Sequence, residues 1–440
     1  MKIAIIIPSF YLNDQLFIKK RLDVVGLTGP YLYSLLKDSF DTALIIERAE
    51  QYDFSQLDVD VAFISASHVN AYRAVEISTM LRKQGIITIC GGYYPSFDAT
   101  TDHAAKYFDS IVVGEVEPIL IRLIYDITQG KIKDVYRSPN TFSMKYMAHP
   151  DFAPIQHIIH PNTFLPIQAT RGCVRGCDFC TMHRVYGKTF KKRPIDDVFI
   201  EVCEYPKCNR FFVDDNIVLD VDYATELFGA LEGRIGRYVI QADYSIASHP
   251  QLLKNMVRAG HPEVYVGFES ISPHSLDSQK FTPGNKKAYA EAIKKMRDAG
   301  IIVDAGFMFG FDNDGPAVFE HTAKFLRQTK CPGFFGWIAY PVPGSRWHSG
   351  LSAEGRLDAD AKFFTKNAEF GIKAFFDPKL MTKKELEFGL WHTFKEAYSF
   401  PSIFRSALSG NYAFSDRAYI LLRGLMCKFA VSKRIHPMFG

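Results

Sequence analysis

The stretch TRGCVRGCDFC, residues 170–180, places three cysteines, Cys173, Cys177 and Cys180, within eight positions. Gly172 precedes the first cysteine, Gly176 precedes the second, and no fourth cysteine follows closely. Thiolates are soft ligands that suit iron–sulfur clusters, and a short spacing lets one loop surround one cluster. Three thiolates bind three irons of a four-iron, four-sulfur (4Fe-4S) cluster and leave the fourth iron open. The sequence therefore predicts a 4Fe-4S cluster with room for a substrate or cofactor.

Structural zinc is the alternative for these thiols. Closed zinc sites use four tetrahedral ligands, commonly from C-x2-C pairs, whereas this group offers three with a three-residue gap. Cys203, Cys208 or His183 would have to supply the fourth ligand. Phe179, directly before the last cysteine, is apolar, as a partly dry cluster prefers.

The cysteine loop follows the first of six alternating strand and helix patterns. The expected strands are LPIQATRG, RFFVDDN, RYVIQADYS, EVYVGFES, IIVDAGFMFGF and GFFGWIAYPVPG. Six such units predict an α/β fold of the partial, TIM-like (βα)6 barrel type over residues 164–350. The cysteines are then expected at the mouth of this barrel, where catalytic groups of the architecture lie.

Residues 1–140 show a second alternating series, which predicts a Rossmann-like parallel sheet. Ligands of such sheets bind beyond the carboxyl ends of the strands. The candidate cofactor-binding residues at those ends are Ser65, Ser67, Gly91, Gly92, Tyr93, Gly114 and Glu115. Glycine lets the backbone approach a large flat cofactor, so a bulky residue at Gly92 is expected to block its entry. Tight turns with no ligand are the alternative.

Three further regions complete the organisation. Residues 141–163 have little pattern and are predicted to form a linker, and residues 351–440 are predicted to form a helical extension. Residues 401–440 carry six Lys or Arg and one Asp. This pattern is compatible with peripheral contact of an amphipathic helix with an anionic membrane. A basic helix packed on the barrel is the alternative.

Composition excludes several classes of protein. The 440 residues are 47% hydrophobic and 23% charged, which indicates a globular chain of more than one domain. Eight cysteines, dense in one place only, argue against a disulfide framework and for a reducing, cytoplasmic setting. No basic tract with interleaved aromatics predicts a nucleic-acid partner, and we find no uninterrupted apolar run of about 18 residues.

The C-x3-C-x2-C motif at the end of the first barrel strand resembles the radical S-adenosylmethionine (SAM) superfamily. YGKTFKKRPIDDVFIEV, QADYSIASHPQLLKNMVRAG and YPVPGSRWHSGLSAEGRL resemble segments of the branch with an N-terminal cobalamin (B12) domain. PYLYSLL, ICGGYYPS and VVGEVEP are similar to segments of that domain, and FFDPKLMTKKELEFG resembles the extension of hopanoid-methylase-like members. The resemblance covers nearly the whole chain.

The resemblance implies three cofactors: the cluster, SAM and cobalamin. SAM would chelate the open iron, and an electron from a donor such as a flavodoxin or ferredoxin would cleave it to a radical that abstracts hydrogen from carbon. A methyl group carried by cobalamin would then make the enzyme a C-methyltransferase for an unactivated carbon of a small-molecule or lipid-like substrate. The D-x-H-x-x-G signature is absent, because Asp102 and His103 are adjacent. Cobalamin is therefore expected without a protein histidine ligand, and a domain that has lost cobalamin binding is the alternative.

The resemblance also assigns residues at the barrel mouth. Asp214 and Asp215, with Asn216, end the second strand and by analogy would hold the amino end of SAM; a capping turn is the alternative. Glu269 would bind a ribose hydroxyl or the methionyl amine, and Gly267 would leave room beside it.

Further polar and aromatic residues are weaker candidates for the same mouth. The polar ones are Gln241 and Ser245. Aromatic residues of the last strand would line an apolar substrate cavity or belong to the core: Phe334, Phe335, Trp337 and Tyr340.

Two other functional classes stay open. One is a radical enzyme that catalyses a rearrangement, an oxidation or a methylthiotransfer, with B12 absent or non-methylating. Methylthiotransferases usually resemble a different N-terminal domain with three cysteines of its own, whereas this region contains Cys90 alone. The other class is a zinc-stabilised binding protein.

Overall fold

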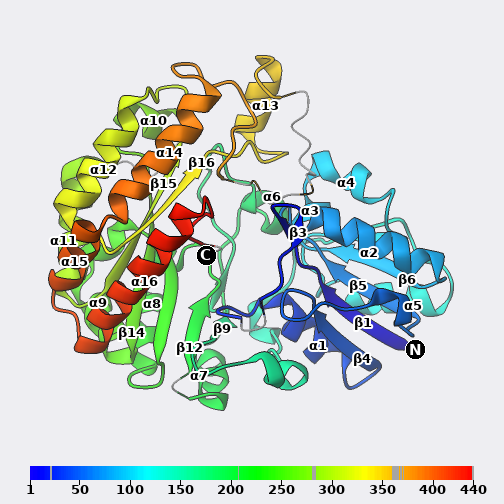
Figure 1. The fold of residues 1–440 in the computed structure, drawn as a ribbon. Coiled ribbons are helices and arrows are strands. Elements are labelled where there is room, and N and C mark those ends of the chain that lie inside the picture. Colours follow the sequence, from blue (N-terminus) through cyan, green and yellow to red (C-terminus); the bar gives the residue numbers. More distant parts are fainter. Residues whose placement is uncertain are drawn as a thin grey trace.

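Two six-stranded parallel sheets, each with its own helices, lie side by side in the protein (Figure 1). This computed structural model describes residues 1–19, 22–206, 208–279, 284–358, 366, 369 and 371–438, without the side chains of residues 98, 99 and 184.

The first sheet has the parallel strand order β4 (Asp41–Ile46), β1 (Lys2–Ile7), β5 (Val61–Ser65), β6 (Ile87–Gly91), β7 (Ser110–Val113) and β8 (Val135–Arg137). Alternate residues of β1 face opposite sides: Ile3 and Ile5 pack toward α1 (Thr28–Leu36) and α5 (Leu120–Thr128), whereas Ala4 and Ile6 pack toward α2 (Ala71–Lys83). Helices on both faces confirm the expected Rossmann-like sheet. Sequence patterns did not predict β8, which buries only its central Tyr136.

Shorter elements complete this half of the molecule. They are β2 (Tyr11–Leu12), β3 (Gln15–Leu16), η1 (Phe54–Gln56), α3 (Tyr93–Ser96) and α4 (Asp98–Ala104). β4 lies on one side of β1 and β5 on the other, so the strand order reverses at β1. Ligands of doubly wound sheets bind in the crevice at such a reversal.

The second sheet has the parallel order β9 (Phe164–Ile167), β12 (Asn209–Phe212), β13 (Arg237–Asp243), β14 (His261–Glu269), β15 (Ile302–Phe309) and β16 (Gly333–Ile338). The strands follow one another in chain order, as in a barrel, and β9 and β16 are the two edges of the sheet. The expected partial barrel is confirmed. The elements between its strands are β10 (Thr170–Arg171), α6 (Met182–Tyr186), β11 (Lys191–Lys192), α7 (Ile195–Glu204), η4 (Ile217–Leu219), α8 (Val221–Ala230), η5 (Tyr244–Ser248), α9 (Pro250–Ala259), α10 (Pro273–Ser278), α11 (Lys286–Asp298) and α12 (Ala317–Thr329).

The segment between the sheets contains η2 (Met144–Tyr146) and η3 (Ala153–Ile158). Phe152, Ile155 and Ile158 are buried in one cluster with Leu22 and with Leu165 of β9. The segment therefore packs between the two halves, although its few apolar residues show no regular period.

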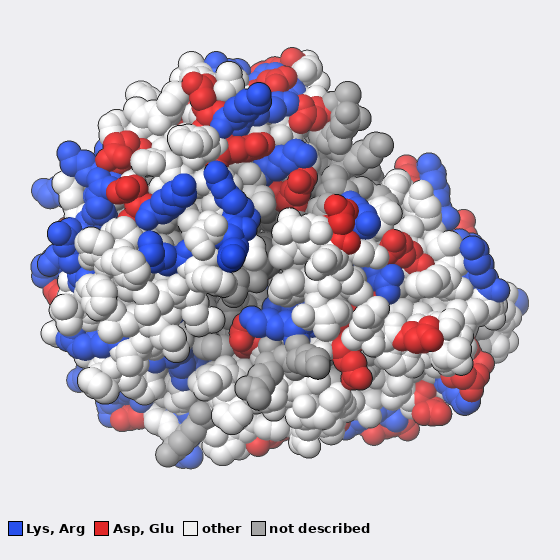
Figure 2. Space-filling view, viewed as in Figure 1, with Lys and Arg blue, Asp and Glu red and all other residues white. Residues whose placement is uncertain are grey.

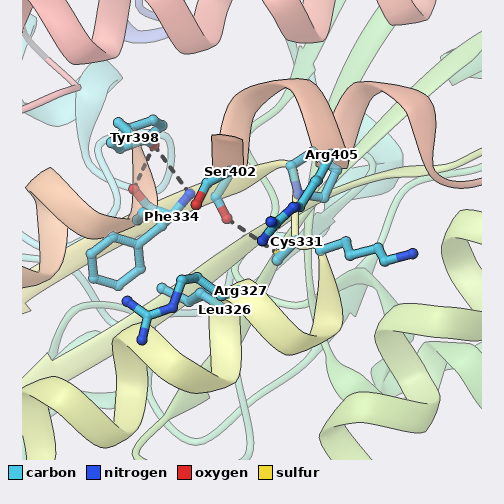
Figure 3. Close-up of a pocket in the computed structure, with 11 residues that line it drawn as sticks. Leu326, Arg327, Cys331, Phe334, Tyr398, Ser402 and Arg405 are labelled. Atoms are coloured by element: carbon cyan, nitrogen blue, oxygen red, sulfur yellow. Dashed lines mark hydrogen bonds between the residues drawn. The ribbon is translucent and has the colours of Figure 1, made fainter. Parts of the chain in front are cut away.

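The C-terminal region forms helices, the second of which packs on the edge strand β16. They are α13 (Arg346–Ala353), α14 (Lys383–Ala397), α15 (Phe400–Leu408) and α16 (Phe414–Ser432). The Tyr398 hydroxyl accepts from the Phe334 N–H at 3.1 Å and donates to the Phe334 carbonyl at 2.7 Å (Figure 3). His436 Nε2 lies 2.9 Å from the Gly336 carbonyl oxygen. Side chains thus satisfy backbone groups that an edge strand would otherwise leave unpaired.

Buried ion pairs attach α16 to the barrel near the amino ends of its strands. Arg423 binds Asp304 at 2.7 Å and also contacts Glu263, while Arg237 binds Asp416 at 2.6 Å. Among the described residues, no helix combines the length and the apolar character needed to cross a membrane.

Candidate functional site

The cysteine loop leaves β10 at the barrel mouth, and polar contacts with several other elements hold it in place. The Gly172 N–H donates to Asp215 at 3.0 Å, and the Arg175 guanidinium binds Asp243 at 2.5 Å. Arg346 of α13 donates to Asp178 at 2.6 Å. These anchors come from β12, β13 and the C-terminal region, so the loop is positioned by distant parts of the chain.

A cavity of about 160 Å³ opens inside this loop. Its lining includes the expected site residues Cys173, Cys177, Phe179, Cys180, Asp215, Gln241, Gly267 and Glu269. Asn216 and His183 also line it, whereas Ser245 lies outside the lining. The structure therefore gathers the cysteines and most of the proposed SAM-binding residues around one space.

Burial disfavours free thiolates in this cavity. It raises the pKa of Cys177 to about 12 and that of Cys180 to about 11, and it also raises the pKa of Cys173. A bound metal deprotonates such thiols directly. In the described part of the chain, no three His, Cys, Asp or Glu side chains converge on one metal ion. The ligands of an iron–sulfur cluster bind different irons and so need not converge.

The structure corrects two of the proposed zinc ligands. Cys203 lies at the end of α7 and Cys208 just before β12, where it packs against the cluster that contains Phe152. That is the amino end of the strands, opposite to the cysteine loop. Neither residue reaches the loop, whereas His183 lines the same cavity as the three cysteines.

Asp214 lies behind the loop rather than in the cavity lining. It is fully buried, and its carboxylate accepts from the Thr170 hydroxyl at 2.6 Å and from the backbone N–H of Thr170. Burial raises the pKa of Asp214 to about 7. The residue thus supports the strand that leads to the cysteines, and its contact with SAM stays a prediction.

Glu269 faces the cavity from a strained backbone. Its φ is 61°, a left-handed value that is uncommon for glutamate, and the pairing of β14 with β15 shifts register between Gly267 and Glu269. A Cβ at Gly267 would lie 2.4 Å from Glu269 Oε1, so glycine makes room for the carboxylate. Burial raises the pKa of Glu269 to about 7. Backbone strain of this kind gathers at functional sites.

A second cavity, of about 430 Å³, lies at the carboxyl ends of the first sheet. All seven turn residues expected at a cofactor site line it: Ser65, Ser67, Gly91, Gly92, Tyr93, Gly114 and Glu115. Three parallel strands, β5, β6 and β7, supply them. No histidine of the described chain belongs to this lining, and His103 instead hydrogen-bonds the Tyr94 hydroxyl at 2.6 Å.

Gly92 is required for a reason that the sequence did not reveal. Its φ is 99°, and a Cβ there would lie 2.5 Å from the Ala66 carbonyl oxygen. A side chain at Gly92 would thus strike the neighbouring turn rather than a ligand. At Gly91 a Cβ would meet nothing within 4 Å, so Gly91 is the position that leaves open space.

The two cavities adjoin, because Asp215 lines both. Next to it, Arg171 binds Glu117 at 2.8 Å and Glu115 at 3.1 Å, both from the turn after β7. Lys191 also binds Glu115, at 2.7 Å. Glu115 therefore has its carboxylate occupied by cations of the barrel half, and the network joins the two sheets beside both cavities.

The aromatic residues of β16, together with Tyr340 just after the strand, divide between the core and the barrel interior. Phe334 is buried and packs on Phe394 of α14. Phe335 faces the other way, with its ring 6.0 Å from that of Tyr265, a residue of the cluster cavity. Trp337 stacks on His436, and Tyr340 packs edge-on against Phe375.

The sequence missed the residues that connect the parts of the site. Arg171, Arg175, Asp243 and Arg346 act through partners 54 to 170 positions away, so no local pattern marks them. Tyr186 lines the second cavity, at the carboxyl ends of the first sheet. It begins the quoted segment YGKTF, but no neighbouring residue in the sequence suggested a role for it.

Known proteins resemble this chain over most of its length. The model of the Radical SAM superfamily matches residues 167–326. The chain is 30% identical over 360 residues to bacteriochlorophyllide d C-12(1)-methyltransferase of Chlorobaculum tepidum, covering 79% of this chain and 78% of that protein. It is 24% identical over 317 residues to hopanoid C-2 methylase of Rhodopseudomonas palustris, covering 68% and 59%.

Two solved structures share the fold. One is the cobalamin-dependent S-adenosylmethionine radical enzyme OxsB with aqua-cobalamin and S-adenosylmethionine bound: TM-score 0.69, 13% identity, 98% of this chain and 72% of that one covered. The other is the radical S-adenosylmethionine methyltransferase TsrM from Kitasatospora setae with cobalamin and a 4Fe-4S cluster bound: TM-score 0.67, 15% identity, 96% and 99% covered. Both likenesses span the two sheets and the C-terminal region.

Proposed function

The chain belongs to the radical S-adenosylmethionine superfamily, in its branch of cobalamin-dependent methylases, and from this premise we propose that it methylates an unactivated carbon of a largely apolar small molecule. The observation that carries the proposal is the adjacency of the two cavities at Asp215. A methyl donor and a hydrogen-abstracting group must both reach one carbon, and adjoining sites meet that demand.

The residues present fit the proposed cofactors. Cys173, Cys177 and Cys180 offer three soft donors for the cluster, and the Gly91 position leaves open space for cobalamin. When bound, these groups would supply a radical that abstracts hydrogen and a methyl group for the resulting carbon radical. The protein would position them, and Glu269, which lines the cavity beside the cysteines, would bind the amine or ribose of SAM.

The substrate belongs to the same proposal. Phe335 and Tyr265 present aromatic surface inside the barrel, next to the cluster cavity. Such surface suits a polycyclic or lipid-like molecule better than a sugar or a peptide. The named substrates of the two relatives, a bacteriochlorophyllide and a hopanoid, are of this kind.

Three finer points complete the proposal. A flavodoxin or ferredoxin would deliver the electron, the C-terminal region would contact a membrane, and cobalamin would bind without a histidine ligand. Residues 1–140, 141–163, 164–350 and 351–440 would be the cobalamin domain, the linker, the barrel and the extension.

Anaerobic reconstitution with iron, sulfide and hydroxocobalamin tests the function. We expect 5′-deoxyadenosine and S-adenosylhomocysteine to form together on addition of SAM, a reductant and substrate. 5′-Deoxyadenosine alone would indicate another radical reaction. Replacing all three cysteines with alanine should abolish SAM cleavage and the EPR signal of the reduced cluster, and cleavage by that variant would refute the assignment.

A further inference from the structure

Helix α16 has two apolar faces. Ile420, Gly424 and Cys427 point inward, and Gly424 packs against Ile403 of α15. Leu422 and Phe429 point outward, with 61% and 65% of their surfaces exposed. A surface helix normally has a polar outer face, so this second apolar face needs an explanation.

Exposed apolar side chains of α15 extend the same surface. We define the α15–α16 face by six exposed residues: Phe404, Leu408, Leu422, Leu425, Met426 and Phe429. Figure 2 shows the surface over α16 as mostly uncharged, with Lys and Arg side chains near its margins. Contiguous apolar surface of this kind marks an interaction site.

The charged side chains of α15 and α16 that face solvent are all positive. Asp416, the sole acidic residue from 400 to 432, is buried against Arg237. Arg423 is buried in ion pairs, and Arg417 caps the last carbonyls of α15. The cations that remain toward solvent are Arg405 and Lys428 on the two helices and Lys433 and Arg434 directly after α16.

We propose that the α15–α16 face docks onto an anionic membrane surface. This proposal rests on the proposed function, in which the substrate is apolar. Apolar side chains would enter the boundary between headgroups and acyl chains, and the cations would attract acidic headgroups. A second copy of the chain fits less well. A twofold contact would place Lys428 and Lys433 of one copy opposite those of the other, with no acidic partner on either helix.

Flotation with vesicles tests the docking. The probe is the anaerobically reconstituted full chain with equimolar phosphatidylglycerol and phosphatidylcholine vesicles. Leu422→Gln with Phe429→Gln should weaken binding about tenfold. Lys428→Gln with Lys433→Gln should weaken it about twentyfold at low salt and reduce its dependence on salt.

The control pair is Ile121→Gln with Tyr125→Gln on α5, where the exposed fractions are 86% and 58%. It should bind vesicles as the unaltered protein does. SAM cleavage without vesicles should be the same in all these proteins, which separates failure of docking from failure of the proposed function.

Two results would overturn the proposal. One is the absence of binding by the unaltered protein, or equal binding by the Leu422→Gln, Phe429→Gln variant. The other is a dimer by light scattering that this variant abolishes, which would make the face a contact between copies.

Discussion

Glu269 combines an unfavourable backbone conformation with a carboxyl group that prefers to stay protonated. Its pKa is about 7 in the folded protein against 4.5 for an ordinary glutamate. Between these values the unfolded chain ionises while the folded one does not, so the free energy of unfolding falls as pH rises. Below pH 4.5 both forms are protonated and the difference disappears.

Glu269→Gln should therefore be more stable than the unaltered apoprotein at about pH 8, by about 1–2 kcal/mol after allowance for solvent screening. Near pH 4.5 the two should unfold alike. Urea denaturation at both pH values measures this, and SAM binding by the reconstituted variant should be weaker. A stability difference that stays constant across this range would show that folding does not raise the pKa of Glu269.

Gly91 and Gly92 should respond differently to a side chain. Gly91→Leu should weaken hydroxocobalamin binding and leave the thermal unfolding temperature nearly unchanged, because its Cβ enters open space. Gly91→Ala should bind nearly as well as the unaltered protein. Gly92→Ala should lower the unfolding temperature, because its Cβ would strike the Ala66 carbonyl at a φ of 99°. Absorbance titration and calorimetry distinguish the three variants, and normal binding by Gly91→Leu would place the cofactor elsewhere.

Sequence reasoning located those residues whose role is local. The cysteines and the turns after β5, β6 and β7 are recognised by spacing and by strand-end position, and the structure gathers them at two cavities. Sequence reasoning expected a side chain at Gly92 to meet the cofactor, whereas in the structure it would meet the Ala66 carbonyl of the turn after β5. It could not find Arg175 with Asp243, because tertiary folding alone brings these two positions together.

At the scale of elements, Tyr398 is the contact that completes the barrel edge. Tyr398→Phe would leave the Phe334 N–H buried without its partner and should lower the free energy of unfolding by about 1–3 kcal/mol. The matched control is Tyr412→Phe, because the buried Tyr412 hydroxyl has no hydrogen-bond partner among the residues that the structure describes. That change should be neutral or stabilising. Equal losses in the two variants would mean that packing, not the edge hydrogen bonds, matters there.

Strand and helix patterns predicted most elements, because each buries a regular apolar face. They failed for β8, an edge strand of the first sheet that buries only Tyr136, and for η3, whose residues are buried among residues of both halves. The C-terminal helices were expected, but their attachment to β16 was not, since it depends on single side chains such as His436.

At the scale of the whole molecule, the Arg171 network fixes one sheet against the other beside both cavities. Arg171→Gln should destabilise the protein by about 3–5 kcal/mol, because buried Glu117 loses its cation. Adding Glu117→Gln should restore part of this stability. In both variants, more 5′-deoxyadenosine should form per methyl group transferred, because the two cofactor sites are no longer held in a fixed position relative to each other.

The control, Arg82→Gln, removes an exposed pair with Asp109 and should change stability by less than about 1 kcal/mol. An unchanged product ratio in the rescued double variant would show that the network only stabilises the fold.

The side chains that cover β16 also set an order of events during synthesis. Tyr398 and His436 follow their backbone partners by 64 and 100 positions. At translation rates of about 5–20 residues per second, the edge strand waits on the order of ten seconds for its cover. During that interval its open backbone can pair with another nascent chain, so slow elongation or premature termination between these positions should send the protein to aggregates or to chaperones.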